Sequence, residues 1–228
     1  MSLASRPHRW ILPLVRAARA ELRFFYLRDP AAALQEELAR RALQEAADFV
    51  QKNMTQALFC RDRFEHLSVA YRQAPASGLA LEFGVYKGAT LRHLAEEDPA
   101  RSFVGFDSFR GLPEDWAGSR HSDRNFDVGG SMPSMPANVT LVDGWFDETL
   151  PRFLRERSEP ASFVHIDCDI YSSTKLVLEA LSERLAEGCV LVFDEFFNYK
   201  AFLEWIDQLG RPFTYIAYSG RQVSVRIG

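Results

Sequence analysis

Two aspartates separated by a single residue follow an apolar run in the segment FVHIDCDIYSSTK, residues 163–175. Side chains alternate along a strand, so Asp167 and Asp169 are expected on one side, with Cα atoms roughly 6.6 Å apart. Two like charges at the end of a buried strand raise each other's pKa unless a counter-charge lies beside them. The spacing therefore predicts a bound group. His165, deeper in the same strand, is expected to be a packed or hydrogen-bonded core residue rather than a base.

The next apolar run, CVLVFDEF, also ends on acids, Asp194 and Glu195. If the two runs form neighbouring parallel strands, their carboxyl ends meet at a spacing of about 4.8 Å. Mg²⁺ takes oxygen ligands and keeps several waters, which a substrate hydroxyl can replace. The acids therefore predict a divalent-cation site. The alternative is helix capping by Asp169 beside a solvated Asp194–Glu195 pair.

A glycine turn follows an earlier strand-like run in LEFGVYKGAT, which contains Glu82, Gly84 and Gly88 in the form E-x-G-x-x-x-G. Glycines there allow a ligand to approach the backbone closely, and the following helix offers free amide donors. The pyrophosphate fingerprint G-x-G-x-x-G is absent. The motif therefore favours a nucleoside ligand that carries a carboxylate, with a purely structural tight turn as the alternative.

The next two strand-like runs end on residues suited to the same ligand. Asp107, in GFDSFRGLPEDW, is placed to accept hydrogen bonds from both hydroxyls of a ribose, although it could also cap a helix. Asp143, Gly144 and Trp145, in LVDGWF, are candidates for contact with an adenine edge or face. Together these residues predict nucleoside binding.

The elements that must position these residues form an α/β domain. Strand-like runs from Leu79 onward alternate with helical stretches, which predicts a parallel sheet with crossover helices. One such helix is expected over 173–188. The last two runs, joined at Ser219–Gly220, predict a hairpin whose final strand is antiparallel. Two helices are expected before the sheet, over 31–54 and 56–74, and the long polar segment 115–137 is either a lid or disordered.

Composition narrows the class of protein. The chain has 228 residues and a formal net charge of −4, so nothing favours a nucleic-acid partner. No apolar run reaches the ~18 residues that a membrane span needs. Cys60, Cys168 and Cys189 show neither disulfide nor zinc spacing, which predicts buried free thiols in a cytoplasmic protein.

The N-terminal region has a different character. Residues 1–28 contain six arginines and one glutamate interleaved with apolar residues. We expect a helical extension over 1–47 that packs on the domain or on a second subunit in a homo-oligomer. Contact with a membrane surface, or a targeting role, is the alternative. The catalytic domain is expected over 48–228.

Five segments in order carry a family resemblance: LEFGVYKG, GFDSFRGLPEDW, VDGWFDETLP, HIDCDIYSST and VLVFDEFFNY. Together they resemble the TylF/NovP-like (macrocin) O-methyltransferase family, which uses S-adenosylmethionine to methylate sugar hydroxyls in secondary metabolism. The resemblance covers roughly residues 48–227. It implies a class I methyltransferase, Rossmann-like fold: a mostly parallel seven-stranded sheet with an antiparallel C-terminal strand.

The resemblance also implies site roles and ligands. S-adenosylmethionine would lie against residues of the glycine turn and of the next three strand ends: Glu82, Gly84, Tyr86, Gly88, Asp107, Ser108, Asp143, Gly144, Trp145 and Asp167. Mg²⁺ would be bound by Asp167, Asp194 and Glu195, and Asp169 would be the general base. The acceptor would be a hydroxyl of a sugar-containing small molecule.

Two departures from the family pattern bear on the acceptor. The family commonly has Asp-Asp where this chain has Asp194-Glu195, and the segment after Tyr199 is short. Two rival functions remain open: a metal-dependent hydrolase that uses the same carboxylates, and a non-catalytic methyltransferase-like binding module. A nicotinamide dehydrogenase is disfavoured because the glycine spacing is wrong and the sheet is expected to end antiparallel.

Overall fold

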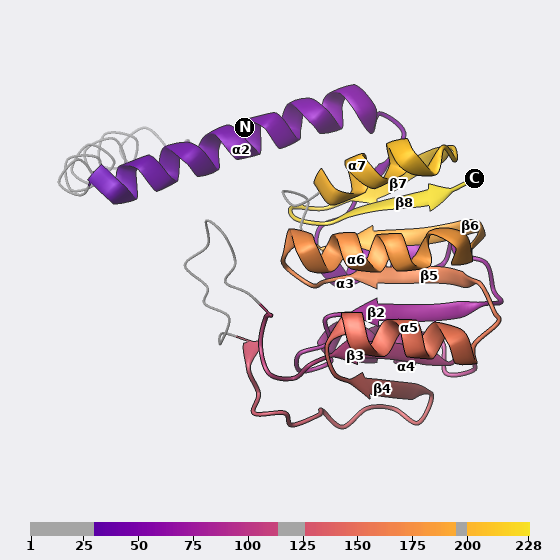
Figure 1. Cartoon of the computed structure of the whole chain (residues 1–228). Coiled ribbons are helices and arrows are strands. Elements are labelled where there is room, and N and C mark those ends of the chain that lie inside the picture. The colour runs from indigo at the N-terminus through magenta and orange to yellow at the C-terminus, as the bar shows by residue number, and fades with distance from the viewer. Residues whose placement is uncertain (1–29, 114–125, 195–199) are drawn as a thin grey trace, which may run out of the picture. The chain divides into compact units, whose positions relative to one another are not determined.

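The computed structural model describes residues 30–113, 126–194 and 200–228 (Figure 1). The chain divides into two compact units, Met1–Asn53 and Met54–Gly228. Within the described residues no helix is long and apolar enough to cross a membrane.

The described part of the first unit is the helix α2, Pro30–Asn53, which confirms the helix expected there. Its surface carries ion pairs one turn apart, in which Glu37 accepts from Arg40 at 2.8 Å and from Arg41 at 2.9 Å. Hydrogen bonds from these two arginines lower the pKa of Glu37 to about 2. Leu34, Leu38 and Leu43 stay largely exposed on this helix. The role of the N-terminal extension remains a prediction.

The second unit is one α/β domain built around an eight-stranded sheet. Its strands are β1 Leu58–Phe59, β2 Leu79–Phe83, β3 Phe103–Asp107, β4 Val139–Asp143, β5 Ala161–Ile166, β6 Leu185–Phe193, β7 Phe213–Tyr218 and β8 Val223–Ile227. Its helices are α3 Arg63–Tyr71, α4 Ala89–Glu97, α5 Phe146–Glu156, α6 Tyr171–Leu181, the short 3₁₀ helix η2 Ser182–Arg184, and α7 Lys200–Leu209.

The strand order is β1-β7-β8-β6-β5-β2-β3-β4. All pairs are parallel except those of β8, which runs antiparallel to both β6 and β7. The hairpin closes through a hydrogen bond from Ser219 N to Gln222 O at 2.9 Å. The mostly parallel sheet with an antiparallel last strand is therefore confirmed.

The sheet has one more strand than the seven expected. Leu58–Phe59 pairs with Ala217–Tyr218 at the edge of the sheet, inside the segment predicted to be helical over 56–74. The helix α3 begins later, at Arg63, because the side chain of Asp62 accepts hydrogen bonds from the backbone N–H groups of Phe64 and Glu65. The prediction of one continuous helix was wrong, since this capping and the edge pairing separate a strand from a shorter helix.

The helix expected over 173–188 also ends early, at Leu181. The following residues turn through η2, and β6 begins at Leu185, which pairs with Ala161 at the start of β5. Residues from Leu185 onward therefore pair in the sheet, although helix propensity alone predicts that they continue the helix.

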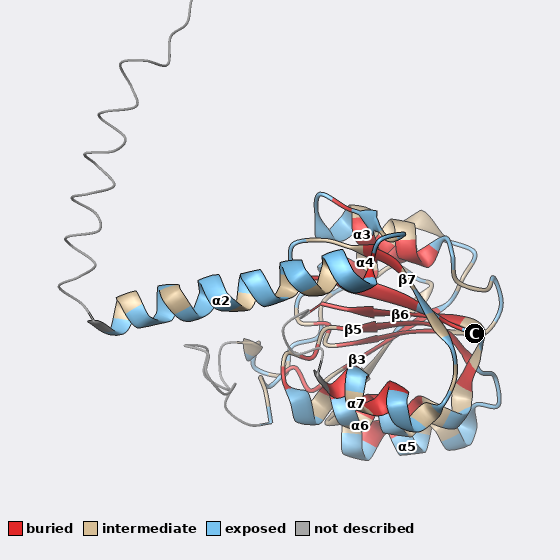
Figure 2. Cartoon of the chain, turned by 90° about the horizontal axis from the view of Figure 1, so that it is seen from above, coloured by how far each residue is buried: buried red, intermediate tan, exposed pale blue. Residues whose placement is uncertain are grey.

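Helices cover both faces of the sheet, with α3 and α4 on one face and α5, α6 and α7 on the other (Figure 2). All six residues of the central strand β5 are buried, as expected for a parallel strand covered on both sides. Stacked and edge-to-face phenylalanines fill the core, and the rings of Phe83 and Phe106 are 4.9 Å apart. Cys60, Cys168 and Cys189 are free and buried, as predicted.

The strand order reverses between β2 and β5. β3 and β4 follow β2 on one side, and β6 follows β5 on the other. In open α/β sheets ligands bind outside the carboxyl ends of the strands at such a switch point. This is where the predicted site residues lie.

Candidate active site

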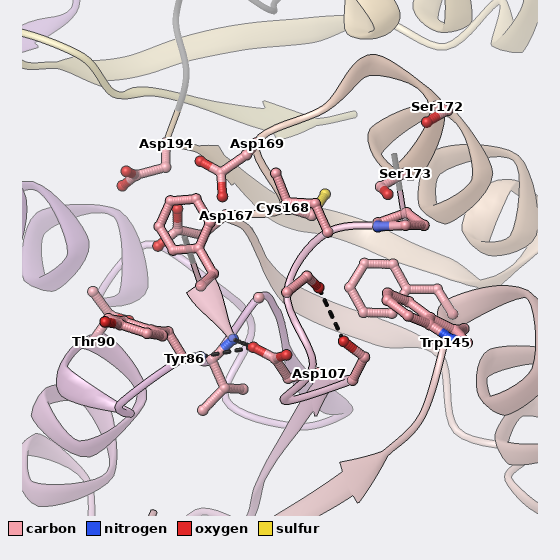
Figure 3. A pocket seen from close by; sticks show the side chains of 18 of the residues that line it. Tyr86, Thr90, Asp107, Trp145, Asp167, Cys168, Asp169, Ser172, Ser173 and Asp194 are labelled. Carbon is pink, nitrogen blue, oxygen red and sulfur yellow. Dashed lines mark hydrogen bonds between the residues drawn. The ribbon is translucent and has the colours of Figure 1, made fainter. Parts of the chain in front are cut away.

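A cavity of about 930 Å³ opens at the carboxyl ends of the strands, above the switch point (Figure 3). Its walls come from the segments that follow β2 to β6, from the start of α3 and from the β7–β8 turn. The lining residues are Arg63, Gly84, Val85, Tyr86, Lys87, Ala89, Thr90, Asp107, Ser108, Gly111, Leu112, Pro113, Phe126, Trp145, Phe146, Asp147, Asp167, Cys168, Asp169, Ser172, Ser173, Leu176, Asp194 and Arg221. The wall thus combines aromatic and aliphatic surface with carboxylates and cations.

The glycine turn after β2 forms one wall because the chain passes very close to the end of β5. Gly84 has φ +93°, and a Cβ atom built on it would lie 1.9 Å from the backbone oxygen of Asp167. No side chain fits there. Gly88, with φ +73°, caps the start of α4 beneath the turn and does not line the cavity.

Asp107 holds this turn in place. Its Oδ2 accepts hydrogen bonds from Val85 N at 2.8 Å and Tyr86 N at 2.7 Å (Figure 3). Its Oδ1 accepts one from Phe109 N at 2.7 Å. The carboxylate still faces the cavity, and an ionised carboxylate offers about four acceptor positions. Its predicted contact with ribose hydroxyls stays a prediction, beside a structural role that sequence reasoning missed.

Glu82 lies beneath the turn rather than in the cavity wall. It is 1% exposed, accepts a hydrogen bond from Thr90 Oγ1 at 3.0 Å, and contacts His165 Nδ1 at 2.8 Å. Glu82 and His165 are direct partners in the β2–β5 ladder. His165 is therefore a buried, hydrogen-bonded core residue, as predicted.

The residues predicted for the adenine region are divided between the cavity and its surroundings. Trp145 lines the cavity, whereas Asp143 forms an ion pair with Arg110, at 2.7 Å from its Nη1, and neither Asp143 nor Gly144 is among the lining residues. Ser108 lines the cavity and shapes the loop after β3 by donating to the backbone oxygen of Gly111 at 3.0 Å.

The acids that follow β5 and β6 lie close together, as predicted. One ligand atom each from His165, Asp167 and Asp194 lie within 4.8 Å of one another. Figure 3 shows the carboxylates of Asp167, Asp169 and Asp194 gathered on one side of the cavity, away from Trp145. Glu195 lies outside the described residues. The oxygens of Asp167 and Asp194 fit a divalent cation that prefers oxygen ligands.

A turn after β5, rather than the strand itself, positions Asp169 near these acids, which differs from the prediction. The strand β5 ends at Ile166, so strand alternation does not place Asp169 beside Asp167. Instead Asp169 has φ +62°, and Ile170 N donates to Cys168 O at 2.6 Å, which closes a tight three-residue turn around it. A non-glycine residue in this conformation is strained, and such strain is concentrated at functional sites.

A cation that sequence reasoning missed lies among these acids. Arg63 Nη2, at the start of α3, is 2.9 Å from Asp167 Oδ2 and 3.7 Å from Asp194 Oδ1. Burial works against its charge, but Asp194 and Asp167 outweigh burial and raise the pKa of Arg63. No local motif marks this arginine, because the contact joins segments 104 residues apart in the sequence.

The pKa values of His165, Asp194 and Asp167 are shifted in different directions. Burial disfavours a charged imidazole, but Asp194 and Glu82 outweigh it and raise the pKa of His165 to about 10. Asp194 is also buried, yet His165, Arg63 and the amide of Gln222 lower its pKa. Burial and the negative charge of Asp194 raise the pKa of Asp167 well above its usual range. Of these two carboxylates, Asp167 is the one whose charge the protein compensates less.

Comparisons with known proteins identify methyltransferases that are similar to this chain. The chain is similar to the 8-demethyl-8-(2,3-dimethoxy-alpha-L-rhamnosyl)-tetracenomycin-C 4'-O-methyltransferase of Streptomyces olivaceus, with 29% identity over 164 residues. The match covers 59% of this chain and spans 60% of that relative's length.

Solved structures share the fold. The calicheamicin methyltransferase CalS11 aligns with a TM-score of 0.61 at 22% identity, over 82% of this chain and 91% of that chain. The O-methyltransferase NovP aligns with a TM-score of 0.53 at 19% identity, over 72% of this chain and 78% of that chain. These similarities confirm the class I methyltransferase fold.

A family model described as a methyltransferase domain matches residues 81–196. The match runs from the glycine turn to the acids that follow β6, so it includes most of the segments that build the cavity, but neither the start of α3 nor the β7–β8 turn. The chain therefore belongs to the methyltransferase domain family.

Proposed function

We propose that this protein is an S-adenosylmethionine-dependent O-methyltransferase that acts on a hydroxyl of a sugar-containing small molecule of secondary metabolism. Family membership supports methyl transfer. The name of the Streptomyces olivaceus relative describes methylation of an oxygen on a rhamnosylated compound, which supports an oxygen acceptor carried by a sugar.

The observation that carries the proposal is that one cavity has both a surface suited to a nucleoside and a group of carboxylates. The apolar surface of Trp145 lies on one side and a group of carboxylates on the other, and the glycine turn runs beside the carboxylates, against the backbone of Asp167. A nucleoside donor needs the apolar surface and the turn, and a hydroxyl acceptor that must lose a proton needs the carboxylates. In our proposal the donor contacts Gly84, Tyr86, Asp107, Ser108, Trp145 and Asp167, with Glu82 and Gly88 supporting the turn from below.

The proposed reaction is a displacement in line with the sulfonium sulfur. The acceptor oxygen forms a bond to the methyl carbon while the carbon–sulfur bond breaks, and the electron pair of that bond stays on sulfur as a neutral thioether. Asp169 accepts the hydroxyl proton, for which a carboxylate held in the cavity wall is suited. Holding both substrates in line supplies much of the rate enhancement.

Asp167 and Asp194, together with Glu195, are the residues we propose to hold Mg²⁺. When bound, such an ion lowers the pKa of a coordinated hydroxyl and offsets developing negative charge. The cavity side chains would then orient the acceptor so that its hydroxyl faces Asp169.

Binding of S-adenosylhomocysteine to the full chain, measured by isothermal titration calorimetry, tests the donor site. We expect micromolar affinity, followed by transfer of a labelled methyl group from S-adenosylmethionine to a panel of deoxysugar-bearing acceptors. If no binding occurs under conditions in which the protein is folded, the donor assignment is wrong, and a hydrolase that uses the same carboxylates becomes the better reading.

A further inference from the structure

Arg63 is held at the carboxylate cluster by the way α3 begins. Asp62 caps the helix by accepting hydrogen bonds from Phe64 N at 2.9 Å and Glu65 N at 3.0 Å, so Arg63 is the first helical residue. Side chains of a helix lean toward its N-terminus. The arginine therefore extends past the end of the helix and over the carboxyl ends of β5 and β6, where its guanidinium meets Asp167 and Asp194.

The partners of this guanidinium are fixed more firmly than the guanidinium itself. The side chains of Asp167 and Asp194 are only 20% and 12% exposed, whereas that of Arg63 is 43% exposed. Asp194 also accepts a hydrogen bond from the buried amide of Gln222 and lies 3.7 Å from Nε2 of the fully buried His165. Asp194 would therefore remain in place if Arg63 moved away, and the arginine side chain is already 43% exposed to solvent.

Nε2 of His165 points into the same cluster without a hydrogen-bond partner among the described residues. It is fully buried, and 3.7 Å to Asp194 is too long for a hydrogen bond. Buried polar atoms in native proteins are nearly always satisfied, so the described side chains leave the hydrogen bonding of this cluster incomplete.

We propose that Arg63 is an exchangeable counter-cation, which neutralises the Asp167–Asp194 pair when no divalent ion is bound and withdraws toward solvent when one binds. This inference rests on the metal site of the proposed function. It assigns to Arg63 the role of setting the concentration of divalent ion at which the site fills. Arg63 is thus a positioning residue, and it takes no proton and forms no bond to the substrate.

The physical reason is competition for the same oxygens. A divalent ion bound by Asp167 and Asp194 would share Oδ atoms with a guanidinium nitrogen that now lies 2.9 Å from one of them. Two cations so close repel each other even at the effective dielectric of a protein surface. Each ion that binds must therefore displace Arg63 first, which weakens the observed affinity.

Titration of the protein with Mn²⁺, followed by electron paramagnetic resonance of the free ion, tests this role without any catalytic readout. Arg63→Ala and Arg63→Gln should each bind Mn²⁺ about tenfold more tightly than wild type, because the competing charge is gone. Arg61→Ala is the matched control. It removes the same charge two residues away, from a side chain that is 84% exposed and pairs with Glu65 instead of with the cluster. We expect its Mn²⁺ affinity to match wild type.

Three results would overturn the inference: unchanged affinity in both Arg63 variants, an equal gain in Arg61→Ala, or no Mn²⁺ binding by any variant. Circular dichroism establishes that each variant is folded, and Arg63→Gln preserves most of the side-chain volume. S-adenosylhomocysteine binding measured on the same samples separates this outcome from failure of the proposed function. If the protein binds the nucleoside but not Mn²⁺, the proposed donor site stands and the proposed exchange of Arg63 for a divalent ion is wrong.

Discussion

The Nδ1 atom of His165 lies 2.8 Å from Oε2 of Glu82, and both side chains are buried opposite each other on β5 and β2. This contact ties together the two strands that flank the switch point. Above it lie the glycine turn on one side and Asp167 on the other. The pair therefore supports the floor of the cavity, and neither residue lines it.

Glu82→Ala should be strongly destabilising, because it leaves the buried His165 and the hydroxyl of Thr90 without their acceptor. Removing one partner of a buried ion pair costs about 3–5 kcal/mol in the free energy of unfolding. Urea denaturation measures the loss. Glu183→Ala, at an exposed position in η2, is the control and should stay within about 0.5 kcal/mol of wild type. A loss at Glu82 no larger than that of the control would contradict the supporting role.

Asp169→Asn tests the proposed base. The substitution keeps the side-chain size and removes the proton acceptor, so methyl transfer should fall about 10²–10⁴-fold while S-adenosylhomocysteine affinity stays nearly constant. Single-turnover assays with saturating donor measure the effect. Asp207→Asn, on the exposed side of α7, makes the same charge change away from the cavity and should react like wild type. Normal turnover by Asp169→Asn would show that another group takes the proton.

Removal of divalent ions tests the proposed role of Asp167 and Asp194. Activity should fall when EDTA is added and return with excess Mg²⁺, since the coordinated hydroxyl loses its proton more easily. Asp167→Asn should raise the Mg²⁺ concentration needed for half-maximal activity, because an amide oxygen carries no charge. Turnover that is indifferent to the chelator in both proteins would remove the metal from the mechanism.

Gly84→Ala should disrupt the turn that contacts the donor. The new methyl group would lie 1.9 Å from the backbone oxygen of Asp167, so the turn or the end of β5 must shift. We expect a loss of S-adenosylhomocysteine binding together with a lower melting temperature. Gly210→Ala is a matched control, because Gly210 also has positive φ, +65°, but a Cβ there meets nothing within 4 Å. That variant carries only the left-handed conformational penalty, about 1–2 kcal/mol, and should bind normally.

The buried imidazole of His66 should make folding stability depend on pH. Burial, aided by the positive charge of His165, lowers the pKa of His66 to about 4, while its Nε2 lies 2.9 Å from Ser224 Oγ. The unfolded chain takes up this proton near pH 6.5, so the unfolded state binds more protons between pH 6.5 and 4. The neutral imidazole of His66 therefore contributes to the free energy of unfolding above pH 6.5. This contribution is lost as the pH falls toward 4, and the total loss is about 3 kcal/mol.

Urea denaturation at pH 7, 5.5 and 4 measures this dependence, and His66→Gln should flatten it. Wild type and variant must be compared because the raised pKa of Asp167 makes the folded state more stable as the pH falls, which opposes the effect of His66. That effect of Asp167 is present in both proteins. Identical pH profiles for wild type and variant would mean that His66 is not the group responsible.

Local patterns in the sequence determined the order of the elements and the strand ends that contribute residues to the cavity. Alternating strand and helix signals sufficed to predict the parallel sheet, and the Ser219–Gly220 turn sufficed for its antiparallel end. The glycine turn, Asp107, Trp145 and the acids after β5 and β6 were found because each belongs to a short motif at a strand end. Such signals operate within about one element's length, where backbone conformation and burial are set by near neighbours.

Tertiary structure alone decided which of these residues face the cavity and what balances their charge. Glu82 contacts its cross-strand partner His165 below the cavity, and Asp143 forms an ion pair with Arg110 outside the cavity wall. The counter-charge of Asp167 is Arg63, contributed by α3, a helix that lies between β1 and β2 in sequence. Neither the sign nor the spacing of nearby residues encodes that contact, because electrostatic neutralisation depends on distances in space, which only the packing of α3 against the sheet sets.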